Sequence, residues 1–216
     1  STRKESSAAS DVYKRQGEAL IDFIPNVTHS KLKDVEQFSR QVGGAPCNVA
    51  ATVSKLGGKS EMITQLGNDA FGDIIVETIE QLGVGTQYIK RTNKANTALA
   101  FVSLQDDGQR DFSFYRKPSA DMLYQPENID DIQVFQDDIL HFCSVDLIES
   151  DMKYAHEKMI EKFESVDGTI VFDPNVRLPL WEDKLECQRT INAFIPKAHI
   201  VKTVSYTHLT LPTTPY

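Results

Sequence analysis

Short apolar runs alternate with helical patterns through the middle of the chain, between residues 17 and 203. Several runs have the length and composition of strands and are bounded by polar or glycine-containing segments. They are "GEALIDFIP", "KSEMITQLG", "DDILHFCSV", "GTIVFDPNVR" and "HIVK". Strands that alternate with helices are typical of α/β proteins. The pattern therefore predicts a mainly parallel sheet with helices on both faces.

The helices lie between these strands, and their ends carry recognisable signals. The segment from Pro46 to Leu56 has a proline in its first turn and Gly57 directly after it, the usual asymmetry of helix start and stop. The next helix begins after Asn68 or Asp69, either of which can cap it. A third helix follows "IES", and "DKLECQRTINAFIPKA" is a fourth. The apolar period of the third predicts these buried residues: Met152, His156, Met159, Ile160 and Phe163.

Two segments, "TALAFVSLQ" and "RDFSFYR", break this alternation. They flank "DDG", a turn signal between two stretches of alternating polarity, and so predict a β-hairpin. Phe112 and Phe114 share one face of the second strand, while Asp111 and Ser113 share the other. We therefore expect a small sheet whose apolar side covers another part of the molecule.

The composition narrows the classes of partner. The chain has 216 residues, of which 40% are hydrophobic, enough for a sizeable core. Its formal net charge is −8 and its basic residues are not clustered, so nucleic-acid and anionic-membrane surfaces are not expected. A small-molecule ligand fits better. Cys47, Cys143 and Cys187 are odd in number and widely spaced, which predicts neither disulfides nor a zinc site and fits a reducing cytoplasm.

The two ends differ from the middle. Residues 1–16 and 204–216 are polar, or rich in Thr and Pro, and show neither a helical nor a strand period. They resemble translated adaptor sequence, and we interpret them as additions to the natural protein, with ordinary disordered tails as the alternative. The domain is then expected to occupy residues 17–203, and the parent protein to be longer on both sides.

Polar residues gather in loops that follow predicted strands, where ligands bind in open α/β sheets. In "VGGAPCN", Gly43 and Gly44 let the backbone approach a ligand closely because neither has a Cβ atom. Asn48 lies in the first turn of the following helix, and its amide can both donate to and accept from a hydroxyl group. A glycine turn that only joins a strand to a helix is the alternative interpretation.

The loop "DPNVRLPLW" holds a second group of candidates. Pro174 ends the preceding strand, so Asn175 and Arg177 project into the loop. A guanidinium in this place suits a phosphate or a carboxylate, although Arg177 could instead pair with Glu182 or Asp183 on the surface.

Asp22 and Arg116 are further candidates. Asp22 stands between Ile21 and Phe23 in a predicted strand, where its carboxylate must face solvent, a cation or ligand hydroxyls. Arg116 ends the hairpin and could reach a ligand beneath the small sheet, but an exposed basic side chain is the commoner arrangement. The sequence has no G-x-x-x-x-G-K-[ST] phosphate loop, which argues against the common NTPases.

Together these motifs resemble the ribokinase-like (pfkB) family of sugar kinases, and within it the bacterial fructokinases. The family's first signature places a small residue or proline, an asparagine and two later glycines at set spacing after a Gly-Gly pair. The residues that match this pattern are Gly43, Gly44, Pro46, Asn48, Ala50, Gly57 and Gly67. The segments "GEALIDF", "GNDAFG", "FSFYRKPSADMLY" and "FDPNVRLPLW" resemble successive fructokinase segments.

The resemblance implies a ribokinase-like, Rossmann-like sheet with a small β lid formed by residues 20–38 and 96–117. It implies phosphoryl transfer from ATP, with Mg²⁺, to the sugar D-fructose in the cytoplasm, and a homodimer through the lid. The sugar-binding residues would be Asp22, Gly43, Gly44, Asn48 and Arg116, and the residues near the nucleotide phosphates would be Asn175 and Arg177.

One family signature does not occur in the sequence: the Gly-Ala-Gly-Asp loop, which supplies the anion hole and the catalytic base. We therefore expect this chain to be an inactive part of an active kinase. One alternative is a 2-keto-3-deoxygluconate kinase, whose substrate carboxylate could use Arg116 or Arg177. The other is a non-catalytic sugar-binding module.

Overall fold

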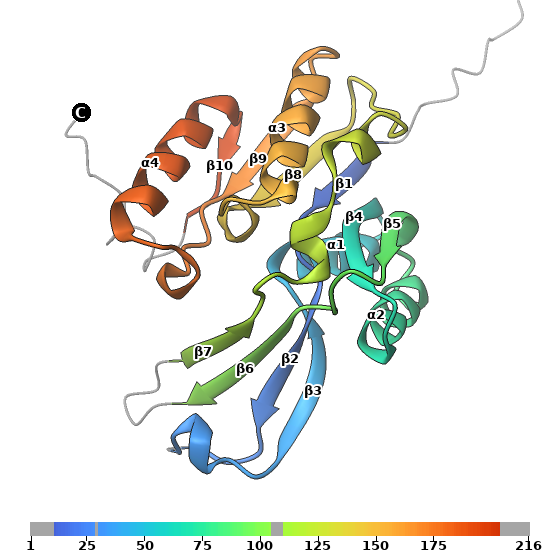
Figure 1. Cartoon of the computed structure of the whole chain (residues 1–216). Coiled ribbons are helices and arrows are strands. Elements are labelled where there is room, and N and C mark those ends of the chain that lie inside the picture. The colour runs from blue at the N-terminus through green and yellow to red at the C-terminus, as the bar shows by residue number, and fades with distance from the viewer. Residues whose placement is uncertain (1–10, 29, 105–109, 204–216) are drawn as a thin grey trace, which may run out of the picture.

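A computed structural model describes residues 11–28, 30–104 and 110–203 of the chain. The described residues form two sheets, a larger one with helices and a smaller one at its edge (Figure 1). Among them, no helix combines the length and apolar character needed to cross a membrane.

The larger sheet has six strands, and every pairing between them is parallel. In spatial order they are β10 (Ile200–Val201), β9 (Thr169–Asp173), β8 (Ile139–Cys143), β1 (Val12–Gln16), β4 (Lys59–Gly67) and β5 (Gly85–Thr92). The chain runs outward from β1 to β5 and then returns to β8 on the other side of β1. The strand order therefore reverses between β1 and β8, the position at which open α/β sheets bind ligands.

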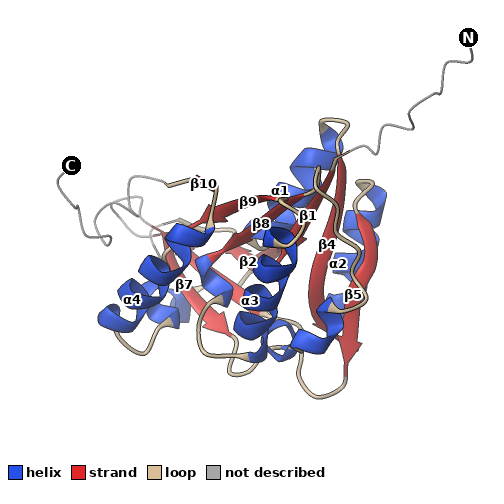
Figure 2. Cartoon of the chain, turned by 90° about the horizontal axis from the view of Figure 1, so that it is seen from above, coloured by secondary structure: helices blue, strands red, loops and turns tan. Residues whose placement is uncertain are grey.

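Helices pack on both faces of this sheet, as the sequence predicts. They are α1 (Ala45–Lys55), α2 (Ala70–Gln81), α3 (Asp151–Glu164) and α4 (Lys184–Phe194) (Figure 2). Successive residues of β4 point to opposite faces of the sheet. Met62 packs with residues of α1 and α2, whereas Ile63 packs with residues of α3 and α4. The mainly parallel α/β fold is confirmed.

The helix ends follow the capping signals. The Asp69 carboxylate accepts hydrogen bonds from the backbone N–H groups of Phe71 (3.1 Å) and Gly72 (2.8 Å), so Asp69 is the N-cap of α2. In α3, all the side chains that the apolar period placed in the core are buried. α1 differs, because its N-cap is Gly44, which has no side chain to bond the free N–H groups.

The smaller sheet has four strands in the order β3 (Phe38–Gly43), β2 (Leu20–Pro25), β6 (Leu99–Leu104) and β7 (Arg110–Tyr115). β6 and β7 pair antiparallel, which confirms the predicted hairpin; its turn lies outside the described residues. β3 and β5 were not predicted. Each lies at the edge of its sheet and carries many polar residues, so neither has a clear strand pattern.

Residues 12–16 are part of the fold, although the sequence-based prediction leaves them outside it. These residues form β1, which is held between β4 and β8. Hydrogen bonding to strands on both sides determines this element, and the polarity pattern does not reveal it. Residues 1–10 and 204–216 lie outside the described part, and the non-native origin of the ends stays a prediction.

β1 is an unusual central strand because three of its side chains are buried polar groups. The Lys14 ammonium pairs with Asp138 at 2.6 Å. Arg15 Nε and Gln16 Oε1 are buried and have no hydrogen-bond partner among the described residues. Burial lowers the pKa of the Arg15 guanidinium to about 10. Central strands of parallel sheets are normally apolar, so the unpartnered buried atoms of this strand carry a desolvation cost.

Neighbouring substitutions in β1 should therefore have opposite effects on stability. Arg15→Val replaces a buried cation, which lies over the Tyr13 ring 5.1 Å from its centroid, with an apolar side chain and should raise the free energy of unfolding by about 1 kcal/mol. Lys14→Val leaves the Asp138 carboxylate buried without its counter-charge and should lower it by about 3 kcal/mol. Urea unfolding of both variants measures the two values. A loss of stability in Arg15→Val would contradict this account of β1.

Candidate functional site

A cavity of about 280 Å³ lies between the carboxyl edge of the larger sheet and the inner face of the smaller one. Glu18, which follows β1, and Val145, which follows β8, both line it. The cavity therefore lies where the strand order reverses. Most of the candidate residues from the sequence also line it: Asp22, Gly44, Asn48, Asn175 and Arg177.

The paired glycines allow two close approaches at the wall of this cavity. A Cβ atom on Gly43 would collide with the carboxylate of Asp22 on the adjacent strand. Gly44 has a φ of +100°, and a Cβ atom there would lie 2.5 Å from the carbonyl oxygen of Glu18. The glycines therefore do more than turn the chain: they bring β2, β3 and the start of α1 together around the cavity.

The N-terminus of α1 points its polar groups toward the same space. Asn48 lies one turn into α1 and is exposed at the cavity wall, and its backbone N–H donates to the Gly44 carbonyl oxygen at 2.9 Å. Its side-chain amide can donate and accept, which suits a ligand hydroxyl. The free N–H groups of the first turn add a positive partial charge.

The smaller sheet turns one face toward the cavity. Asp22, Leu20 and Ile24 alternate along β2 on this face. Phe112 and Phe114 of β7 complete it, with ring centroids 5.6 Å apart. The predicted apolar side of the hairpin therefore covers the cavity. The Asp22 carboxylate lies among these apolar groups, where it can accept hydrogen bonds from ligand hydroxyls.

Asn175 and Arg177 approach from the loop after β9. The Arg177 guanidinium lies over the Phe112 ring, 5.3 Å from its centroid, and its Nη1 donates to the Val176 carbonyl oxygen at 3.1 Å. This contact joins the loop to the smaller sheet. A guanidinium in this place gives the cavity wall a permanent positive charge.

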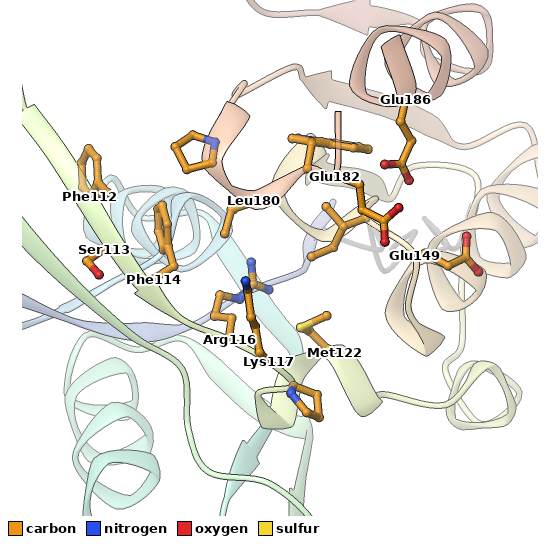
Figure 3. A pocket seen from close by; sticks show the side chains of 14 residues that line it. Phe112, Ser113, Phe114, Arg116, Lys117, Met122, Glu149, Leu180, Glu182 and Glu186 are labelled. Carbon is orange, nitrogen blue, oxygen red and sulfur yellow. The ribbon is translucent and has the colours of Figure 1, made fainter. Parts of the chain in front are cut away.

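Arg116 does not line this cavity. It is buried, so the commoner arrangement of an exposed basic side chain is wrong for this residue. Its guanidinium pairs with Asp121 and, at 2.6 Å, with Asp146. It lines a neighbouring cavity of about 630 Å³, where it lies between Phe112 and Phe114 on one side and acidic residues on the other (Figure 3).

The sequence analysis missed the buried acidic residues beside the cavity. Burial and then the nearby Asp146 carboxylate raise the pKa of Glu18 well above its usual range. Burial opposes ionisation of Asp146 too, but the Arg116 guanidinium lowers its pKa. The only sequence signal for Glu18 is an acid among apolar residues, which resembles the solvent-exposed position of a strand.

Glu18, Cys143 and Asp146 place potential metal-ligating atoms within 4.8 Å of one another. These atoms already bond within the protein: the Cys143 thiol donates to Glu18 Oε2 at 3.3 Å, and Asp146 accepts from Arg116. Burial raises the pKa of the thiol well above its usual range, which disfavours the thiolate that metals bind. The cluster therefore fits an internal network better than a metal site.

Comparison with known proteins identifies the family of the chain. Residues 16–205 match the model of the pfkB family carbohydrate kinases. The chain belongs to this family. It is 41% identical over 186 residues to probable fructokinase-4 of Arabidopsis thaliana, covering 86% of this chain and 57% of that protein. Fructokinase-2 of Solanum lycopersicum is 39% identical over the same length, with 57% of it covered.

Solved structures of pfkB-type kinases share the fold. Fructokinase from Xylella fastidiosa has a TM-score of 0.74 at 34% identity, over 88% of this chain and 58% of that one. Fructokinase from Vibrio cholerae, with fructose, ADP and calcium bound, has a TM-score of 0.79 at 30% identity, over 89% and 60%. A Pyrococcus horikoshii sugar kinase with ATP also scores 0.79, at 34% identity over 88% and 62%. The chain thus spans little more than half of these kinases.

The two kinds of glycine environment give a test of the cavity wall. Gly44→Ala forces a Cβ atom against the Glu18 backbone at positive φ and should cost about 3 kcal/mol of unfolding free energy. Gly57 also has a positive φ, of +88°, but nothing lies within 4 Å of its Cβ position. Gly57→Ala should cost only about 1 kcal/mol. Equal losses in urea unfolding would contradict the close approach at Gly44.

Proposed function

We propose that the protein to which this chain belongs transfers the γ-phosphoryl group of ATP to a hydroxyl group of D-fructose, giving fructose 6-phosphate. One observation carries the proposal: a carboxylate, a helix N-terminus with an asparagine, and an arginine meet at one small cavity at the sheet's point of reversal. The fructokinase names of the similar proteins support the same substrate.

The cavity suits a small ligand that is rich in hydroxyl groups. Its volume of about 280 Å³ lies below the roughly 300–1,000 Å³ typical of drug-sized ligands. Asp22 can accept hydrogen bonds from sugar hydroxyls, and Asn48 can both donate and accept. Gly44 lines the cavity as well, so its backbone groups can contribute to binding.

ATP supplies the transferred group, and this chain's residues fit only its phosphate end. Arg177 and Asn175 at the cavity wall are suited to an anion. The sequence holds no Gly-Ala-Gly-Asp loop to act as anion hole and base. The buried cluster around Glu18 does not suit a magnesium–phosphate complex, which keeps water ligands. We therefore propose that the nucleoside pocket, the base and the Mg²⁺ site belong to the remainder of the kinase.

The smaller sheet would act as a lid over the sugar. Its inner face places Phe112 and Phe114 over the cavity. Apolar rings there exclude water, so that the sugar hydroxyl and not water accepts the phosphoryl group. Arg116 would support this lid from its buried position. We further propose that it contacts the sugar or the phosphate directly.

The cysteine pattern supports the cytoplasm as the compartment.

A second candidate activity is the phosphorylation of 2-keto-3-deoxygluconate. The observation that favours it is the Arg177 guanidinium at the cavity wall, which can pair with a substrate carboxylate. Fructose has no carboxylate, so a direct comparison of the two sugars as ligands separates these functions.

A titration of this chain with fructose, followed by the fluorescence of its single tryptophan or by calorimetry, tests sugar binding. Asp22→Ala should weaken binding about tenfold or more, because hydrogen bonds to a charged group contribute about 1.5–3 kcal/mol. Asp73→Ala is a matched control on the surface, where Asp73 pairs with Arg91. It should bind fructose normally.

The possible results separate the proposals. Tighter binding of 2-keto-3-deoxygluconate than of fructose supports the second activity, and no binding of either sugar contradicts both. The full-length parent with ATP, Mg²⁺ and fructose should form fructose 6-phosphate. A parent that binds fructose but transfers no phosphate would be a non-catalytic sugar-binding module.

We also propose that the lid mediates a homodimer. The outer face of the smaller sheet carries an aromatic cluster in which Phe101 stacks on Phe23 at 4.7 Å and meets Phe38 and Tyr115. Tyr115 is 63% exposed. Phe23, Phe38 and Phe101 are half-buried, and an exposed aromatic side chain beside such a cluster is typical of protein interfaces. Sedimentation analysis should show a dimer for the native chain and a monomer for Tyr115→Lys; two identical profiles would contradict the lid interface.

A further inference from the structure

Glu18 lies where the chain first passes from the larger sheet to the smaller one. It follows β1 of the larger sheet and precedes β2 of the smaller one, and it is buried at the wall of the candidate sugar cavity. No part of the proposed sugar chemistry uses its side chain. Burying a carboxyl group costs free energy unless hydrogen bonds or a charged partner compensate it.

The side chain of Glu18 bonds a free backbone N–H group at the start of α1, where the N-cap residue has no side chain. Its Oε1 accepts a hydrogen bond from the backbone N–H of Ala45 at 2.9 Å, directly after the paired glycines. Ala45 is the first residue of α1, so this bond satisfies one of the free N–H groups at the helix start, where the N-cap Gly44 offers no side-chain acceptor. An acceptor at a helix N-terminus typically stabilises it by about 1 kcal/mol. Glu18 thus fixes the backbone that carries Gly44 and Asn48 at the cavity.

The backbone of Glu18 is tied to a second crossing between the sheets, the one from β7 to β8. Its N–H donates to Asp146 Oδ2 at 2.7 Å, while Asp146 Oδ1 accepts from Arg116 at 2.6 Å. Arg116 directly follows β7, where the chain leaves the smaller sheet. Asp146 therefore holds the chain's first entry to the smaller sheet and its last exit from it on one carboxylate.

Burial and then the Asp146 carboxylate raise the pKa of Glu18, whereas Arg116 and the Ala45 N–H act in the opposite sense, and four side chains face the carboxyl group. They are Asp146 on the turn after β8, Cys143 at the end of β8, Arg116 after β7 and Cys47 in α1. Only Arg116 is positive, and Asp146 stands between it and Glu18 in the network. A neutral carboxyl group can accept from Ala45 with one oxygen and donate from the other to Asp146.

We propose that Glu18 is a positioning residue of the sugar site: its carboxyl group bonds the first N–H of α1 and so holds the Gly44–Asn48 backbone against the cavity. This inference rests on the proposed sugar binding for its functional consequence. It assigns no contact between Glu18 and the reacting atoms. This role explains why a buried acid lies beside the candidate sugar site.

Two substitutions test this role. Glu18→Ala removes the cap and should weaken fructose binding about tenfold, measured by calorimetry well below the unfolding temperature. It should also speed hydrogen exchange at the Ala45 amide. Glu18→Gln keeps an acceptor for Ala45 and a donor for Asp146, so its fructose affinity should stay within about twofold of the native value. If Glu18→Gln weakened fructose binding as much as Glu18→Ala, the positioning role of a neutral carboxyl group would be wrong.

Asp138→Ala is the matched control. Asp138 is also a buried acid that accepts a backbone hydrogen bond, from Val12 at 3.2 Å, and it pairs with Lys14. It lies at the opposite, amino end of the sheet, before β8. Asp138→Ala should lower the unfolding temperature and leave both fructose affinity and Ala45 exchange unchanged. If it weakened fructose binding as much as Glu18→Ala, the effect would be one of general stability, and the proposal would fail.

Protonation gives an independent readout. A carboxyl group that is neutral in the folded state and ionised in the unfolded state makes stability fall as pH rises above the group's ordinary pKa. Glu18→Gln removes this titration, so its unfolding temperature should gain on that of the native chain between pH 5 and pH 8, a range of about three units over which an ordinary Glu is ionised. A constant difference across this range would contradict the neutral carboxyl group.

The outcomes also separate this inference from the proposed function. If the native chain binds no sugar, the proposed function fails for this chain, and the exchange rate at Ala45 alone decides the positioning role. If the native chain and Glu18→Ala bind fructose equally, or if Ala45 exchange is unchanged by the substitution, the positioning role is overturned while the proposed function stands.

Discussion

The carboxylate of Asp146 joins two of the four places at which the chain passes between its sheets, the one from β1 to β2 and the one from β7 to β8, and the shape of the candidate site depends on this joint. One oxygen accepts from the Glu18 backbone and the other from the Arg116 guanidinium. The larger sheet can then turn its carboxyl edge, and the smaller sheet its apolar face, toward one cavity.

Close backbone approach is the structural condition for this arrangement, and glycines provide it. A Cβ atom on Gly17 would lie 2.5 Å from Asp146 Oδ2, and one on Gly43 would meet the Asp22 carboxylate. In both cases a carboxylate occupies the space that a side chain would need. Gly44 adds a positive φ and contact with the Glu18 carbonyl group. The glycines and the acids therefore form one structural unit around the cavity.

Much of the candidate site could be predicted from the sequence because its residues lie in short motifs after strands. Asp22, the paired glycines and Asn48 are brought together, and the loop after β9 adds Arg177. Arg116 was a different case, because its burial depends on Asp121 and Asp146, which lie in other segments. Glu18 was missed for the same reason: nothing in its local sequence shows that Ala45 and Cys143 will contact it.

The sequence by itself determined the α/β alternation, the helix caps, the hairpin and the fold family, since periodicity and motif spacing are local properties. Only the tertiary structure decided that residues 12–16 form a central strand, because pairing with β4 and β8 overrides a polar composition. It also decided which acids are buried and which bases neutralise them. Burial and pairing arise between segments that are distant in the chain, and local sequence patterns do not carry that information.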